Sequence, residues 1–229
     1  MSNSTFNGKL SASLSSLCLL ALVGVACKLS SLPGAKMNMF ESTNAADGAA
    51  KVKAKLGVDA IKVSRIEIHE DRLSIVIQDP AKPKNYDEYT YEKGVLAGPK
   101  PVPAMVIGNN ELSADKMPLF DLNSANLGAV ADVCRKVIER AKVEDGKCEL
   151  ISVNWESARW TRTKEENDRL QDEKDKEFQR KMMAGKIDPN EEMRKSLGDL
   201  AVTWRVYVRG PRATKDFWVD LKGNVFDYH

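Results

Sequence analysis

The 229-residue sequence is poor in the residues and motifs of catalysis. It has two histidines, His69 and His229, and it lacks the motifs G-x-S-x-G, G-x-x-x-x-G-K-[ST], H-E-x-x-H and C-x-x-C. These absences exclude the nucleophile elbow, the phosphate-binding loop, the common zinc-protease helix and the dithiol redox site. We therefore predict no catalytic residue, no metal site and no cofactor. A hydrolase with an unrecognised pair of acidic residues is the alternative.

A surplus of charge of either sign is also missing. Lys plus Arg number 35 and Asp plus Glu number 33, which leaves a net charge of +2. A protein that tracks phosphate groups needs a basic surplus on one face, so we predict no nucleic acid among the partners. Hydrophobic residues make up 42% of the chain and charged residues 30%, which is typical of a folded globular body.

Long hydrophobic runs are absent as well, and the longest run lies near the N-terminus. Residues 17–26 are apolar, and Lys9 is the only charged residue before them. Ten residues span about 15 Å in a helix, half of a hydrocarbon core of about 30 Å. A weakly basic start, a short apolar run and small residues are typical of a secretory signal peptide. We predict that residues 1–26 are such a signal; a buried core helix is the alternative.

The small residues of this run lead directly to Cys27. The segment 23–27 (VGVAC) resembles the lipobox of bacterial lipoproteins, although Gly24 stands where that family most often has leucine. The resemblance implies cleavage before Cys27, a diacylglyceryl group on its thiol and, usually, an acyl chain on the new amino group. Two or three acyl chains hold a protein on a membrane where one would not. Cleavage to a soluble periplasmic form, without lipid, is the alternative.

The residues after Cys27 are typical of a tether in the cell envelope. The residue after the cysteine is Lys28. In Gram-negative lipoproteins an Asp at this position favours retention at the inner membrane, so the resemblance implies the outer membrane, facing the periplasm, if the source is Gram-negative. Residues 27–44 include Pro33, Gly34 and several Ser and Asn residues, a composition that predicts a flexible link to the lipid. No later segment approaches 18 continuous apolar residues, so the lipid on Cys27 is the only predicted contact with the membrane.

Cysteine is scarce in the rest of the chain, where only Cys134 and Cys148 remain. In an oxidising compartment an even pair is a disulfide candidate. A closed loop of about 15 residues would stabilise the fold by about 3 kcal/mol on the chain-entropy model. Two buried thiols are the alternative. A metal site is not expected, because two thiols without a nearby histidine make half a site.

The C-terminal half predicts one helix followed by four strands. Apolar residues recur every three or four positions after Ser124, which predicts a helix over 124–142. Alternation of apolar and polar residues then predicts strands over 149–160, 200–209 and 217–221. A turn at Lys222-Gly223 precedes a short last strand.

The N-terminal half has the same order in a weaker form. A helix is expected over 45–57, and strands over 61–68, 73–78 and 86–91, with a turn at Lys93-Gly94 before a fourth strand. We predict an α+β fold of two tandem units, each a helix packed on an antiparallel sheet. The units cover 45–110 and 124–229, and residues 111–123 link them.

This order of elements resembles the β-lactamase-inhibitor-protein-like and PepSY-like families at the level of topology only. Those families are mostly small extracytoplasmic binding or inhibitory modules, so the resemblance implies a binding protein. No diagnostic motif is shared, and no functional residue is carried over.

One segment of the second unit exceeds a minimal repeat. Residues 161–197 hold ten basic and ten acidic residues, and charges at this spacing support a helix through i,i+4 pairs. We expect a helical insertion, with a longer helix near 163–183 and a short one near 189–197. It is either a solvated hairpin or an arm that contacts another protein.

The clearest candidate for recognition lies in the C-terminal half, which holds all four tryptophans of the chain. Strand alternation places five residues of hot-spot type on the sheet face opposite the helix. They are Trp160, Arg205, Tyr207, Arg209 and Trp218. We predict that this face binds a periplasmic protein or a cell-wall component. The sharper version is an inhibitor or immunity-type protein that neutralises a periplasmic enzyme. The alternative is that the face packs on the first unit or under the charged insertion.

Overall fold

The computed structural model describes residues 37–103, 106–107, 110–111, 118–185 and 200–227. The predicted signal peptide, the lipidation candidate Cys27 and the short helix expected near 189–197 lie outside these residues. Among the described residues, no helix has the length and apolar character needed to cross a membrane.

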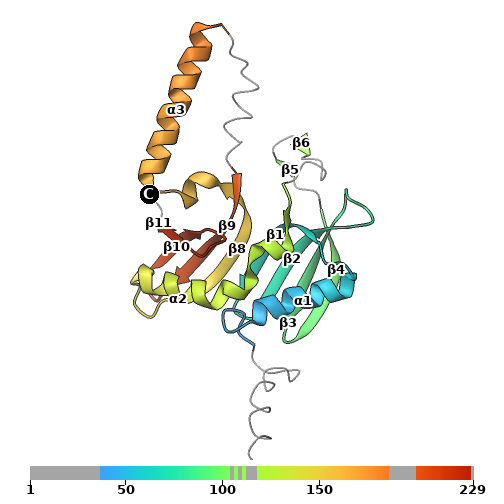
Figure 1. Cartoon of the computed structure of the whole chain (residues 1–229). Helices are drawn as coiled ribbons and strands as arrows, with labels where there is room; N and C mark the ends of the chain where they lie inside the picture. Colours follow the sequence, from blue (N-terminus) through green and yellow to red (C-terminus); the bar gives the residue numbers. More distant parts are fainter. Residues whose placement is uncertain (1–36, 104–105, 108–109, 112–117, 186–199, 228–229) are drawn as a thin grey trace, which may run out of the picture.

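The first half consists of one helix and four strands. Helix α1 (Asn44–Leu56) ends at Gly57, whose φ of 66° is the left-handed conformation that closes a helix. The strands follow in antiparallel order (Figure 1): β1 (Lys62–His69), β2 (Arg72–Gln78), β3 (Tyr86–Glu92) and β4 (Val95–Val102). The β3–β4 turn is Lys93-Gly94, and Gly94 has a φ of 79°, so the sequence prediction for this turn is confirmed.

The second half repeats this order. Helix α2 (Val130–Ala141) is followed by β8 (Lys147–Ser157), β9 (Leu200–Arg209), β10 (Thr214–Val219) and β11 (Val225–Asp227). Gly223 has a φ of 84° in the turn between the last two strands. The α+β class and the order of helix and four strands are therefore as predicted.

The two halves form one continuous antiparallel sheet, whereas the sequence predicts two units that each have a sheet of their own. The strand order is β11-β10-β9-β8-β1-β2-β3-β4, so the first strand of each half pairs with the first strand of the other. The short strand β7 (Phe120–Asp121) pairs with the start of β1. A separate hairpin of β5 (Val106–Ile107) and β6 (Asn110–Glu111) precedes it.

Positions 85 residues apart correspond between the halves. Leu56 ends α1 six residues before Lys62, and Ala141 ends α2 six residues before Lys147. With this offset the buried helix positions Ala45, Gly48, Ala49 and Val52 match Val130, Val133, Cys134 and Val137, which are also buried. Glu67 pairs with Ser152 across the β1–β8 junction, and these two residues are themselves 85 apart. The halves are thus related by a local two-fold axis at this pair.

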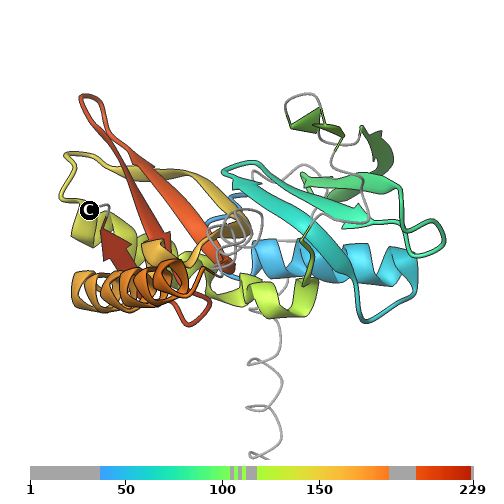
Figure 2. The ribbon, with the colours of Figure 1, turned by 90° about the horizontal axis from the view of Figure 1, so that it is seen from above.

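Helices α1 and α2 cover the same face of the sheet, as the view from above shows (Figure 2). The core lies between them and the strands and includes Ile66, Ile75, Ile151, Trp204 and Val206, each at most 1% exposed. We call the opposite face of the sheet the open face, because no α-helix in the described part of the chain packs on it.

Several boundaries differ from the sequence prediction. The strand expected over 149–160 runs from Lys147 to Ser157, because residues 158–161 form a 3₁₀ turn, and the strand expected over 217–221 runs from Thr214 to Val219. The α-helix of the second half begins at Val130 and not near Ser124, because residues 122–125 and 127–129 form two 3₁₀ turns first. Asp121 accepts a hydrogen bond from the Asn123 N–H and caps the first of them. The folded body also begins before residue 45, since Met39 and Phe40, placed in the tether, are buried in the core.

A long helix leaves the body between β8 and β9. Helix α3 (Lys164–Met183) matches the helix expected near 163–183, and Thr163 and Glu166 form a capping box at its start. Between β8 and α3 lies a 3₁₀ turn, η5 (Ala158–Thr161). Figure 1 shows α3 projecting away from the sheet and the two other helices.

Candidate functional site

The candidate site starts from side chains of β9 and β10 on the open face. In these strands Trp204, Val206, Phe217 and Val219 point into the core. Alternation therefore directs the residues between them to the other face. Arg205 pairs with Trp218 across the two strands, and Tyr207 pairs with Asp216.

The turn η5 brings a second tryptophan to this face. Ala158 is buried, and the ring of Trp160 stacks on the ring of Trp218, with the centroids 4.9 Å apart and the planes at 26°. A stacked aromatic pair contributes about 0.5–1.5 kcal/mol beyond its buried area. This contact holds the end of β8, and with it the base of α3, against the sheet.

Two arginines extend the stack. The guanidinium of Arg159 lies 3.9 Å from the centroid of Trp160. The guanidinium of Arg205 lies 4.9 Å from Trp218 and 5.1 Å from Tyr207. Each cation–π contact is worth about 0.5–2 kcal/mol, depending on its exposure. We call the five residues Arg159, Trp160, Arg205, Tyr207 and Trp218 the Trp–Arg cluster.

A neighbouring carboxylate, Asp216, stabilises the positive charge of Arg205 in the cluster. Arg205 donates hydrogen bonds to Asp216 at 2.7 and 3.1 Å. Burial works against the charge of Arg205, but the hydrogen bonds with Asp216 and the negative charges of Asp216 and Glu156 act in the other direction, and the pKa of the guanidinium is raised. Burial also raises the pKa of Tyr207, so the phenol stays protonated. The cluster therefore presents a fixed cation and a hydroxyl donor beside aromatic rings.

The structure brings together four of the five predicted binding residues. Trp160, Arg205, Tyr207 and Trp218 are linked by ring contacts, whereas Arg209 forms an ion pair with Glu149. Trp218 is only 2% exposed, so it supports the cluster from below. Strand alternation correctly assigns these residues to the open face. It does not predict that η5 folds back over this face and covers Trp218.

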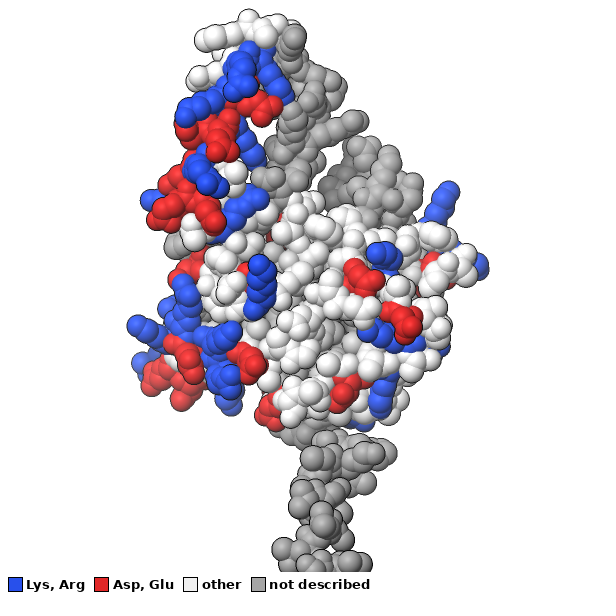
Figure 3. All heavy atoms as spheres, in the orientation of Figure 1, with Lys and Arg blue, Asp and Glu red and all other residues white. Residues whose placement is uncertain are grey.

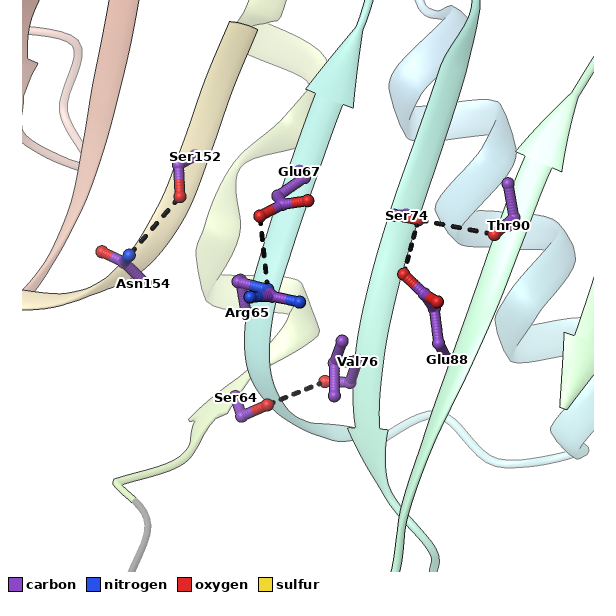
Figure 4. Close-up of polar contacts among 9 residues, drawn as sticks. All are labelled: Ser64, Arg65, Glu67, Ser74, Val76, Glu88, Thr90, Ser152 and Asn154. Carbon is purple, nitrogen blue, oxygen red and sulfur yellow. Dashed lines mark hydrogen bonds and ion pairs between the residues drawn. The ribbon is translucent and has the colours of Figure 1, made fainter. Parts of the chain in front are cut away.

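The open face of the first half has a different character (Figure 4). There Ser74 donates to Glu88 at 3.0 Å and lies 3.4 Å from Thr90, and Arg65 pairs with Glu67 at 3.4 Å. Asn154 and Ser152 of β8 continue this polar strip. Among the described residues, the tryptophans and the contacts between arginine and aromatic rings thus lie in the second half.

The two cysteines lie on the other side of the sheet. Cys134 of α2 and Cys148 of β8 are both buried and are free thiols in the structure. The hydrogen bond between them, together with burial, raises the pKa of the Cys134 thiol. Their proximity is what the disulfide prediction requires, and the bond itself stays a prediction.

In the described part of the chain, no three or more His, Cys, Asp or Glu side chains are grouped so that they could hold a metal ion. Comparison with known proteins finds no matching family model, no matching curated protein and no matching solved structure. The Trp–Arg cluster is a group of side chains whose composition and geometry suit recognition.

Proposed function

We propose that this chain is a lipid-anchored lipoprotein of the cell envelope that binds another molecule and makes or breaks no bond. The Trp–Arg cluster supports the binding role. The lipobox-like segment ending at Cys27 supports the anchor, with the body at the outer membrane facing the periplasm. The ligand is a periplasmic protein or a cell-wall component, and an inhibitor or immunity-type role is the narrower form of the proposal.

One observation carries the binding role. The cluster is a continuous ladder in which Arg159 covers Trp160, Trp160 stacks on the buried Trp218, and Arg205 covers both Trp218 and Tyr207. Hot spots of protein interfaces are rich in Trp, Tyr and Arg held rigidly by their neighbours. A ladder of this kind fixes its rotamers before binding, so little side-chain entropy is lost when a partner covers it.

The binding role is tested by comparing two arginine variants and one tryptophan variant. We expect Trp160→Ala and Arg159→Ala to weaken binding to purified cell-wall sacculi or to proteins retained from an envelope extract by at least about ten-fold, as for hot-spot residues. Arg209→Ala is the matched control, because Arg209 lies outside the ladder. Each variant is first checked by circular dichroism for an intact fold.

Two outcomes would contradict the binding role. If the parent protein and Trp160→Ala retained the same material equally well, the Trp–Arg cluster would not be the binding site. Hydrolysis of a glycan or peptide panel that disappears on substitution of one carboxylate would support the enzyme alternative.

The anchor is tested separately through Cys27. We expect Cys27→Ser to move the protein from the membrane fraction to the soluble fraction, since the lipid is the only predicted membrane contact. Intact-mass spectrometry of the parent protein should show a chain that begins at residue 27 and carries acyl groups. An unchanged distribution between fractions would contradict the anchor and leave the binding test unaffected.

A further inference from the structure

The two ends of the Trp–Arg cluster differ in charge. At one end Arg205 donates hydrogen bonds to Asp216, and the negative charge of Glu156 also acts on it. At the other end the guanidinium of Arg159 lies 3.9 Å from the centroid of Trp160, and no carboxylate in the described part of the chain forms an ion pair with it. The first end therefore has more negative than positive charge, whereas the second has an uncompensated cation.

Arg159 is held in place without a counter-charge. The ring of Trp160 supports one face of its guanidinium, while the side chain as a whole is exposed to solvent. Several other arginines of the described chain have carboxylate partners, namely Arg65, Arg72, Arg135, Arg140 and Arg209. A fixed cation whose charge is not neutralised by the protein itself is suited to receive a negative group from a ligand.

The chemistry of the guanidinium selects the kind of negative group. An arginine that stacks by its face keeps the N–H donors in its plane available at the edge. These donors match the two oxygens of a carboxylate in a bidentate pair. The single positive charge of Arg159 balances one carboxylate, whereas a phosphate group, with a charge of about −1.5 to −2, would leave negative charge unpaired.

The overall charge of the chain does not provide this selectivity. The net charge is +2, and basic and acidic side chains lie intermixed along α3 and over α2 on the face drawn in Figure 3. A mixed surface of this kind exerts little long-range attraction on an acidic partner. Recognition of a carboxylate would therefore depend on one particular cation at short range.

We propose that the Trp–Arg cluster binds an acidic segment of a partner protein, and that a side-chain carboxylate of the partner pairs with Arg159. This inference rests on the proposed function and names its ligand. The carboxylate lies at η5, and an uncharged part of the partner covers Tyr207 at the other end, where the negative charges beside Arg205 disfavour a second acid. A protein partner is favoured because Trp, Tyr and Arg are the residues of protein interfaces.

Binding of defined polymers to the full-length protein in detergent tests the proposal. We expect fluorescently labelled poly-L-glutamate to bind the parent protein and Arg159→Ala to weaken this binding by at least about five-fold. Arg159→Lys keeps the charge but loses the planar donor set, so it should weaken binding as well. The matched control is Arg169→Ala, which removes the same charge from an exposed arginine of α3 that has no ring contact. It should bind as the parent does.

The outcomes that would overturn the proposal are distinct. Equal weakening by Arg159→Ala and Arg169→Ala would show a general effect of charge. No binding of poly-L-glutamate, or equal binding of poly-L-glutamine, would remove the carboxylate. Tighter binding of polyphosphate that also depends on Arg159 would show a phosphate ligand instead.

Failure of this inference can be told apart from failure of the proposed function. If poly-L-glutamate does not bind but Trp160→Ala still abolishes retention of envelope material, the cluster binds a ligand other than an acidic protein. If Trp160→Ala changes neither, the binding role itself is wrong.

Discussion

The two halves of the sheet fill the same layer with different side chains. In the first half Gly48 of α1 lies over Leu73 and Tyr91, and a Cβ at Gly48 would approach these side chains to 2.7 and 2.6 Å. The corresponding residues of the second half are Val133, Trp204 and Val219. One half combines a glycine with a tyrosine, and the other combines two valines with a tryptophan. The order of helix and strands is the same in both halves, but different side chains fill the corresponding core positions.

The halves differ most between their first two strands. Two residues join β1 to β2, whereas 42 residues separate β8 from β9. The longer connection supplies both η5, which completes the Trp–Arg cluster, and α3. The second half therefore holds the Trp–Arg cluster, and the first half extends the sheet that supports it.

The largest expected effect tests whether the halves unfold together. Trp204→Ala should lower the free energy of unfolding by about 3–5 kcal/mol, and Leu73→Ala, at the corresponding position, by about 2–5 kcal/mol. Since the halves share one sheet and one core, each variant should shift a single denaturation curve measured by circular dichroism. Two separate transitions would show that the halves unfold independently.

The second prediction concerns the cysteines, which the first half replaces by Ala49 and Val63. Formation of the Cys134–Cys148 bond should stabilise the protein by about 3 kcal/mol relative to the reduced form. Urea denaturation with and without reductant measures this difference. The variant Cys134→Ala plus Cys148→Val copies the first half and should unfold identically in both conditions. No effect of reductant on the parent protein would contradict the disulfide.

The smallest expected effect tests the packing at Gly48. Gly48→Ala should destabilise the protein by about 1–3 kcal/mol through overpacking, although alanine has a helix propensity about 1 kcal/mol better than that of glycine. At the matching site Val133→Ala should also destabilise, by about 2 kcal/mol, because buried methyl groups are lost. A Gly48→Ala variant that is more stable than the parent would mean that Tyr91 and Leu73 move aside at little cost.

Local periodicity was sufficient to predict most of the elements. The bounds of α1 and α3 lie within one residue of those expected, and both lysine–glycine turns adopt the left-handed φ at glycine. These features depend on residues close in sequence, such as the capping pair Thr163 and Glu166 and the terminating Gly57. Element order could therefore be predicted without any relative for comparison.

The missed features depend on contacts between distant segments. Pairing of β1 with β8 joins residues about 85 positions apart through backbone groups, which leave no mark in the sequence. The fold-back of η5 buries Trp218, although alternation alone assigned it to an accessible face. Within the candidate site, Asp216 was missed, yet its place two residues before Trp218 in an alternating strand was a usable signal.

The direction in which α3 points limits where it can act. The Met39 N–H donates to the Glu70 carbonyl at the β1–β2 turn, whereas α3 begins beyond Ser157 at the other end of β8, so the start of the body and the arm lie at opposite ends of the sheet (Figure 1). If lipid holds the N-terminal side, the arms of neighbours in one leaflet all point outward in the same sense. The arm of each chain is then held on the side of the body that faces away from its own membrane.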